Sequence, residues 1–243
     1  FKIDWGSYTP PVPRMLGIRV FEDYSLEDLT RYIDWMPFFN AWEFRGTFPE
    51  ILTDPNVGEE ASNLYADARR MLKQIIRERW LTAKGVFGLF PANSVDDDDV
   101  EIYTDESRTQ VLARLHFLRQ QKGKPPGQSH DCLAYFVAPK ASGRRDYIGA
   151  FAVTAGIGIE AHLERFQQEH DDYSSILLKA LADRLAEAFA ERLHERVRRE
   201  FWGYAPDERL TNEQLIKEEY RGIRPAPGYP ACPDHTEQAT LWQ

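Results

Sequence analysis

The longest periodic stretch of this sequence runs from Tyr173 to about Trp202 and limits the fold more than any other feature. Apolar side chains recur along it at every fourth position: Leu177, Leu181, Leu185, Phe189, Leu193, Val197 and Phe201. Four-residue spacing keeps side chains on one side of a helix, but each step overshoots a full turn by about 40°. The sequence therefore predicts a long helix that buries a wide, slanted apolar band in place of a coiled-coil seam.

The remaining patterns predict strands and shorter helices around that element. Alternating or continuous apolar runs predict strands at residues 16–21, 85–90, 100–103, 111–117, 133–137 and 147–153. We expect Pro91 to Asn93 to end the second of these strands. Helical spacing and capping signals predict helices at residues 25–33, from Pro37 onward, and at 59–80, 160–170, 211–220 and 236–242.

Charge and composition narrow the classes of partner. The 243 residues include 39 acidic and 30 basic side chains, a net charge of −9, with no long basic run, which argues against a nucleic-acid partner. No apolar run approaches the roughly 18 residues of a membrane span, and the N-terminus lacks a signal-peptide pattern. Cys132 and Cys232 lie far apart in the sequence and show no paired spacing, which is typical of proteins of the reducing cytoplasm. We therefore expect a cytoplasmic protein that binds neither nucleic acid nor a membrane.

Motifs of the common enzyme classes are missing from the sequence. It contains no glycine-rich phosphate loop, no nucleophile elbow and no His-Glu-x-x-His motif, so we predict no catalytic residue. Cys232 and His235 are potential metal ligands, but no other cysteine or histidine is near them in sequence, and we expect no metal site. His194, on the predicted long helix, is expected at the surface.

One stretch near the C-terminus has the character of either a ligand site or a stiff loop. We call residues 221–235 the proline strip, because four of the ten residues from Arg224 to Pro233 are proline. Each proline fixes its own φ and favours an extended conformation of the residue before it. The strip should therefore present Arg224 and Tyr229 from a stiff backbone, with Gly228 allowing a close approach. The residues alone leave the two readings equally open.

Carboxylates that could complement Arg224 occur elsewhere in the chain. Asp34 lies in an aromatic-rich segment, either at a surface helix end or in an apolar wall. Asp183 and Glu187 lie one turn apart on the predicted long helix, away from its apolar band, as an exposed acidic ridge or a pair facing a groove. An arginine fork suits a ligand carboxylate, and a carboxylate suits an ammonium or sulfonium group.

Seven segments, in the same order, resemble the S-adenosylmethionine-binding activation domain of cobalamin-dependent methionine synthase. Arg224 to Tyr229 is similar to its Arg-x-x-x-Gly-Tyr motif, and residues 32–35, 88–93, 146–153, 181–191, 198–204 and 219–224 continue the match. The resemblance covers essentially the whole chain, as one domain over residues 1–243. It implies an α+β fold: a C-shaped single domain with a central twisted, largely antiparallel sheet flanked by helices. The family domain continues past Gln243, so its C-terminal part is expected to be missing here.

The resemblance also implies a function. The family domain binds S-adenosylmethionine and presents its methyl group for reductive methylation of cob(II)alamin, which reactivates the synthase in methionine biosynthesis. The chain would then be a domain of the methyltransferase, not catalytic alone. Its implied partners are the cobalamin-binding domain, which holds the cobalamin, and flavodoxin or a flavoprotein reductase. The alternative is a non-enzymatic module that docks the reductant or the cobalamin domain.

The resemblance further implies the residues of the ligand site. Arg224 corresponds to the arginine that binds the methionyl carboxylate, and Asp34 to a further contact. Glu187 and Glu218 are implied to face the charged end of the ligand. The extended backbone that lines the ligand corresponds to Pro225, Ala226, Pro227, Gly228 and Tyr229.

Overall fold

The longest strand, β2 (Thr82–Val95), organises the sheet of this computed structural model. The structure describes residues 3–243, and residues 1–2 of the predicted domain lie outside the described part. Strand β5 (Asp146–Ile157) pairs with one edge of β2 along most of its length. The other edge pairs first with β1 (Gly17–Tyr24) and then with β3 (Asp99–Tyr103), and β4 (Val111–His116) pairs with β3. Every pairing is antiparallel, which confirms the predicted type of sheet.

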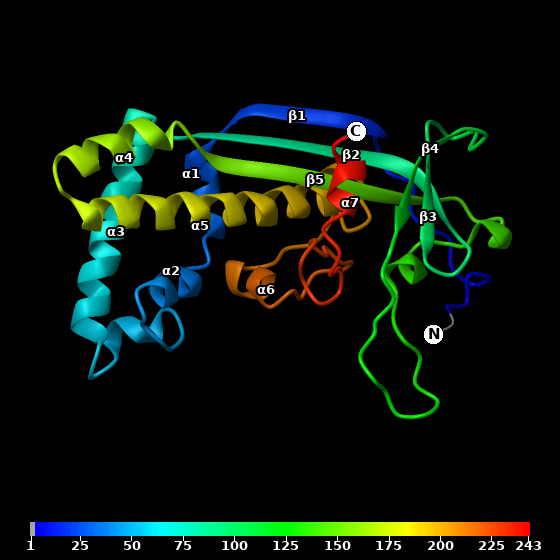
Figure 1. Ribbon diagram of the computed structural model, residues 1–243, viewed down its shortest axis with the longest axis horizontal. Helices are drawn as coiled ribbons and strands as arrows, with labels where there is room; N and C mark the ends of the chain where they lie inside the picture. Colours follow the sequence, from blue (N-terminus) through cyan, green and yellow to red (C-terminus); the bar gives the residue numbers. More distant parts are fainter. Residues whose placement is uncertain (1–2) are drawn as a thin grey trace.

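The predicted long helix lies lengthwise along one face of the sheet (Figure 1). It is α5 (Asp172–Arg196), and its first turn is capped by the side chain of Asp171, which accepts a hydrogen bond from Ser174 N at 2.9 Å. The helix continues as a single π-turn, Val197–Phe201, closed by a bond from Trp202 N to Val197 O. The apolar band is buried as predicted, at Leu177, Leu181, Leu185, Phe189 and Leu193, and the structure packs it on the sheet.

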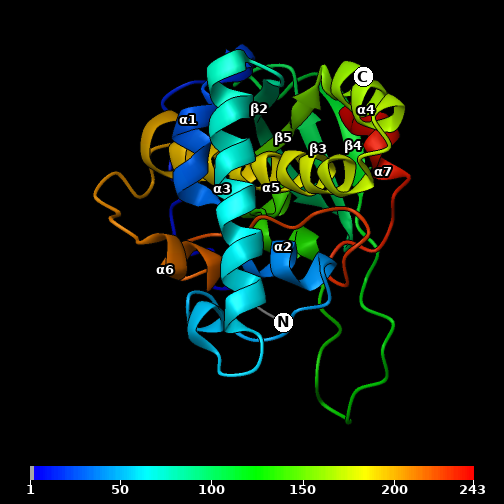
Figure 2. The ribbon, with the colours of Figure 1, turned by 90° about the vertical axis from the view of Figure 1, so that its left-hand side faces the viewer.

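The other helices complete an outline shaped like a C. Helices α2 (Met36–Ala41) and α3 (Gly58–Glu78) extend from one end of the sheet, and the β3–β4 hairpin with its following loop extends to the same side from the other end (Figures 1 and 2). Between them lie α6 (Asn212–Ile216) and the proline strip. The remaining helices are α1 (Leu26–Leu29), α4 (Ile159–Gln168), α7 (Glu237–Leu241) and four 3₁₀ turns, Thr30–Tyr32, Glu50–Thr53, Leu133–Phe136 and Lys140–Ser142. Across residues 3–243, no helix is long and apolar enough to cross a bilayer.

Two predictions about strands are wrong. Residues 133–137 form a 3₁₀ turn, Leu133–Phe136, whose Val137 N bonds to Ala134 O at 3.1 Å in place of a strand ladder. A short apolar run does not by itself distinguish a strand from a buried turn. Strand β2 also continues through Pro91, because the pairing with β1 has ended at Leu89 and that with β3 begins only at Ala92. On that edge of β2 there is no ladder for the proline to interrupt.

Candidate ligand site

The proline strip is not a single extended segment. Residues 223–226 form no helix, strand or turn, and the chain then turns twice, with Gly228 N bonded to Cys232 O at 2.8 Å and Cys232 N to Tyr229 O at 2.9 Å. Gly228 has a φ of +95°, and a Cβ added there would lie 2.6 Å from two ring atoms of His235. The expectation of one stiff, extended segment is therefore corrected beyond Ala226. Within this chain it is the His235 ring that approaches Gly228 closely.

Arg224 reaches from the strip to α5 and pairs with Glu191. Its Nη2 lies 2.9 Å from Glu191 Oε2, and the two side chains are 23% and 12% exposed. Within residues 3–243, neither Glu191 Oε1 nor Arg224 Nε, both buried, has a hydrogen-bond partner. Burial raises the pKa of the Glu191 carboxyl, and Arg224 and Arg198 oppose that shift. The two side chains thus form a close ion pair, but one donor of Arg224 and one acceptor of Glu191 lack hydrogen-bond partners within residues 3–243.

A second layer of polar side chains lies beneath this pair. Arg198, on the π-turn, is fully buried and donates to Glu208 Oε2 from Nε at 2.9 Å and from Nη2 at 2.7 Å. Its guanidinium carbon lies 4.2 Å from the centre of the Tyr220 ring. Arg198 Nη1 donates to His194 Nδ1 at 2.8 Å, so that nitrogen carries no proton. Arg198 therefore fixes the segment that leads into the proline strip against α5.

His194 is buried, 6% exposed, so the prediction of a surface histidine is wrong. It lies beside the apolar band of α5, where the chain after the π-turn covers it: the Tyr220 ring meets its imidazole edge to face at 4.8 Å. Burial lowers the pKa of His194 from 6.5 to about 2, and Arg198 and Arg224 add to this shift. The imidazole is thus held neutral in the folded protein.

This neutral histidine predicts a loss of stability on acidification. Between pH 6.5 and 5 an unfolded histidine binds a proton that the folded one excludes, so the free energy of unfolding should fall as the pH is lowered, with a slope that approaches about 1.4 kcal/mol per pH unit. Urea unfolding of the wild type and of His194→Gln across this range tests the prediction. The difference between the two free energies should change with that slope, and parallel curves would contradict a buried neutral His194.

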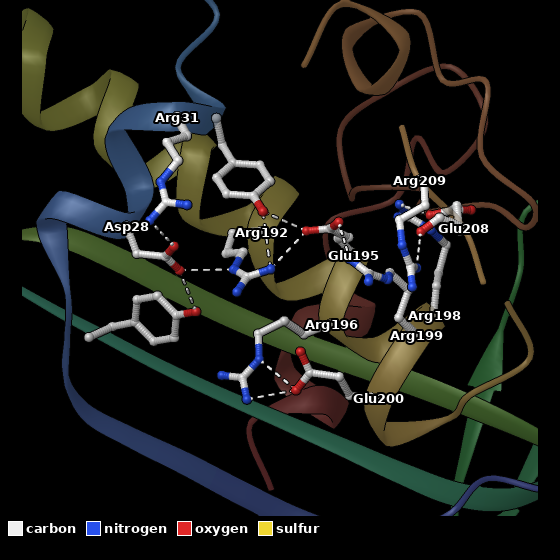
Figure 3. A network of polar contacts seen from close by, with 12 residues as sticks. Asp28, Arg31, Arg192, Glu195, Arg196, Arg198, Arg199, Glu200, Glu208 and Arg209 are labelled. Carbon is white, nitrogen blue, oxygen red and sulfur yellow. Dashed lines mark hydrogen bonds and ion pairs between the residues drawn. The ribbon is translucent and has the colours of Figure 1, made fainter. Parts of the chain in front are cut away.

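Two further polar side chains of α5, Arg192 and Glu195, bind the helix to α1 and to the 3₁₀ turn that follows it (Figure 3). Arg192 Nε lies 2.9 Å from Asp28 Oδ2, and Arg192 Nη1 lies 2.8 Å from Glu195 Oε2. Glu195 also accepts hydrogen bonds from Tyr32 at 2.6 Å and from Arg199 at 2.9 Å. Together with the residues described above, these side chains form one polar side of α5 and its π-turn. We call it the polar flank: Glu191, Arg192, His194, Glu195, Arg198 and Arg199. The polar flank joins α5 to α1 and its 3₁₀ turn, and through Glu191 to the strip.

The structure brings some of the predicted site residues together and leaves others apart. Glu218, at φ +56° just after α6, is exposed but lies close enough to Glu191 to act with burial in raising the pKa of that carboxyl. Glu187 is exposed on α5, one turn before Glu191. Asp34 accepts a hydrogen bond from Met36 N at 3.0 Å at the start of α2. In the described part of the chain, neither Asp34 nor Glu187 bonds to Arg224.

Reasoning from the sequence did not find the polar flank or Tyr220. A signal was present, because Glu191, Glu195 and Arg199 recur at four-residue spacing beside the apolar band. What the spacing does not give is the partner of each charge, since that depends on how the chain returns after the π-turn. Among the described residues, no three His, Cys, Asp or Glu side chains come together in a way that could hold a metal ion.

Comparison with known proteins places this arrangement in a family. The family model described as vitamin B12 dependent methionine synthase, activation domain, matches residues 25–243. A crystal structure described as the MetH reactivation domain bound to AdoHcy is 58% identical in sequence and superposes with a TM-score of 0.95. The match covers 100% of this chain and 74% of that one. The chain therefore belongs to the activation-domain family of vitamin B12-dependent methionine synthases.

Proposed function

We propose that this chain binds S-adenosylmethionine and presents its methyl group to a cobalamin held by a partner domain of methionine synthase. The observation that carries the proposal is Arg224, held by the proline strip against Glu191 with its Nε buried and, within residues 3–243, without a partner. A ligand carboxylate would complete the hydrogen bonding of that guanidinium. The 58% identical relative with AdoHcy bound supports the same ligand class for this chain.

The charges around Arg224 suit a zwitterionic sulfonium ligand. Arg224 would bind the methionyl carboxylate, while Glu218 and Glu187, both exposed, and Asp34 would face its positive groups. The backbone from Pro225 to Tyr229 would line the ligand. No nucleophile is assigned in the described chain. The contribution of the chain to the reaction would be to hold the methyl group in line with the acceptor. This converts a bimolecular step into an effectively unimolecular one.

The acceptor and the reductant are assigned to partners. We place cobalamin in the cobalamin-binding domain of the synthase, as membership of the activation-domain family implies. When bound there, cobalamin would supply the acceptor for the methyl group, with one electron from flavodoxin or a flavoprotein reductase, and S-adenosylhomocysteine would be left. The chain would thus be one domain of 5-methyltetrahydrofolate–homocysteine methyltransferase, not catalytic alone and acting in methionine biosynthesis in the cytoplasm.

Substitution of Arg224 tests the proposal. Arg224→Lys keeps the charge but loses the planar fork, so we expect the affinity for S-adenosylhomocysteine to fall at least about tenfold, which is about 1.4 kcal/mol. Isothermal titration calorimetry measures the affinity. Arg221→Lys is the matched control, because Arg221 is exposed on the same strip and donates only to Tyr204 O and Tyr8 Oη, each at 3.3 Å. It should bind within about twofold of the wild type.

Two results would count against ligand binding through Arg224. One is a wild type that gives no heat with S-adenosylmethionine or S-adenosylhomocysteine, and the other is an unchanged affinity in Arg224→Lys. If the chain binds flavodoxin but gives no heat with either ligand, the result would instead favour the alternative function, a non-enzymatic docking module.

A further inference from the structure

One stretch of α3 is basic although the chain as a whole is acidic. Residues 69–77 contain four cations and no acid, whereas the whole chain has 39 acidic and 30 basic side chains. All four cations are exposed, and their three- and four-residue spacing places them along one solvent-facing side of the helix. We call this side of α3 the basic ridge, which is about 12 Å long. It consists of Arg69, Arg70, Lys73 and Arg77.

Contacts within the chain neutralise only part of the basic ridge. Arg70 and Arg77 each pair with a neighbouring acid of α3, at 2.9 and 2.6 Å, and these pairs are exposed. Arg69 donates to the Tyr65 hydroxyl group at 3.1 Å. Within residues 3–243, no acidic group lies within 4.0 Å of the charged nitrogens of Arg69 or Lys73. Two charges of the basic ridge are thus left without a counter-ion.

The stability of α3 does not account for these charges. Cations favour the C-terminal end of a helix only within about the last turn, which includes Arg77 but neither Arg69 nor Lys73. Lys73 also lies four residues from a like charge on each side, at Arg69 and Arg77, an arrangement that destabilises a helix. The basic ridge therefore weakens α3 slightly, and its charges are available to a partner outside this chain.

The basic ridge lies outside the opening of the C. In Figure 1 the proline strip lies between two arms, one of which contains α3, and Figure 2 views the molecule from the side of that helix. The buried residues of α3 share one core with those of α5, so the exposed side of α3 faces away from α5. A protein bound to the basic ridge would therefore leave the opening free for the domain that approaches the ligand.

We propose that the basic ridge docks the acidic face of the flavoprotein that supplies the electron. This inference rests on the proposed function, in which the cobalamin domain and the reductant act on the same methyl transfer. The cobalamin domain must reach the ligand beside Arg224, so the reductant needs a different surface. Electron carriers form small, short-lived complexes, and complementary charge gives such complexes fast association without tight binding. The resemblance implies a reductant, and this proposal adds the surface that receives it.

Binding of two flavoproteins to the chain tests the basic ridge. The probes are flavodoxin loaded with FMN and the FMN-containing domain of a flavoprotein reductase, and surface plasmon resonance measures Kd from about 0.05 M to about 0.5 M salt. The wild type should bind at least one probe. The double variant Arg69→Gln with Lys73→Gln should bind that probe about tenfold more weakly at low salt, and the two affinities should converge at high salt.

A second double variant matches the change in net charge. Lys122→Gln with Lys179→Gln removes two exposed cations, on the loop after β4 and on α5, that make no ion pair among the described residues. This control should bind the probe within about twofold of the wild type. The ridge variant should be at least as stable as the wild type in urea, because it removes like-charge repulsion. It should also bind S-adenosylhomocysteine within about twofold of the wild type.

The outcomes separate this inference from the proposed function. A wild type that binds S-adenosylhomocysteine but neither flavoprotein overturns the docking surface and leaves ligand binding intact. Equal affinities of the wild type and the ridge variant at low salt also overturn it. Equal weakening by the control variant overturns it as well, because net charge and not the basic ridge would then set the affinity. A wild type that does not bind S-adenosylhomocysteine overturns the proposed function itself.

Discussion

Arg198→Met is expected to lower the free energy of unfolding by about 3–5 kcal/mol. The guanidinium of Arg198 is fully buried, and both of its hydrogen bonds to Glu208 end on one carboxylate oxygen, Oε2. Methionine fills much of the same volume but leaves Glu208, whose side chain is only 9% exposed, as a buried charge without its counter-ion. Urea unfolding followed by circular dichroism measures the change.

Two further variants determine whether the orphaned charge causes this loss. Lys217→Met removes the cation of an exposed pair with Glu213, with side chains 58% and 76% exposed, and should cost no more than about 0.5 kcal/mol. The double variant Arg198→Met with Glu208→Leu removes both charges and should recover much of the stability lost in the single variant. A double variant as unstable as Arg198→Met would show that packing around Tyr220, rather than charge, dominates.

Elements defined by periodicity could be predicted from the sequence. The apolar band of α5 and the strands β1 and β5 follow from patterns along the chain, and the structure has each of them within a few residues of its predicted bounds, although Ile18 and Val20 of β1 are exposed. The family resemblance added the C-shaped α+β architecture, which the match to the activation-domain fold confirms. Local patterns are sufficient wherever one face of an element is buried and the other is not.

Features that depend on how distant segments meet could not be predicted. Cys132 and Ala134 are buried in a small cluster with Ala92, and that packing, not the local apolar run, decides that Leu133–Phe136 is a turn. The pairing of Arg224 with Glu191 joins residues 33 positions apart, after the chain has returned toward α5 beyond the π-turn. The spacing of α5 identifies a polar flank, but it does not say which acid Arg224 meets.

The two sides of α5 have different tasks, and the site depends on both. The polar flank carries Glu191 and Arg198 toward the strip, while the apolar band fixes the depth and rotation of the helix on the sheet. Because the helix is rigid, a shift of the apolar side moves Glu191 relative to Arg224. Changes to the contact between helix and sheet should therefore affect ligand affinity as well as stability.

Phe189 and Gly85 make a close, buried contact between α5 and the sheet. Phe189 is fully buried, and its ring end sits over Gly85 on β2, where an added Cβ would lie 2.8 Å from Phe189 Cζ and 3.2 Å from Val153 Cγ1. We expect Phe189→Ala to lower the free energy of unfolding by about 3–5 kcal/mol through the cavity it leaves. Gly85→Ala should cost about 1–3 kcal/mol, because the new methyl group overpacks the same point.

A double-mutant cycle on this pair tests the interpretation. If the ring of Phe189 is what excludes a methyl group at residue 85, Gly85→Ala should cost less in the Phe189→Ala background, with a coupling energy of about 0.5–3 kcal/mol from urea unfolding. Gly123→Ala is the matched control, since a Cβ there meets nothing within 4 Å among the described residues. It should change stability by no more than about 0.5 kcal/mol. Additive costs in the cycle would mean that Val153 or strand strain, and not Phe189, makes residue 85 a glycine.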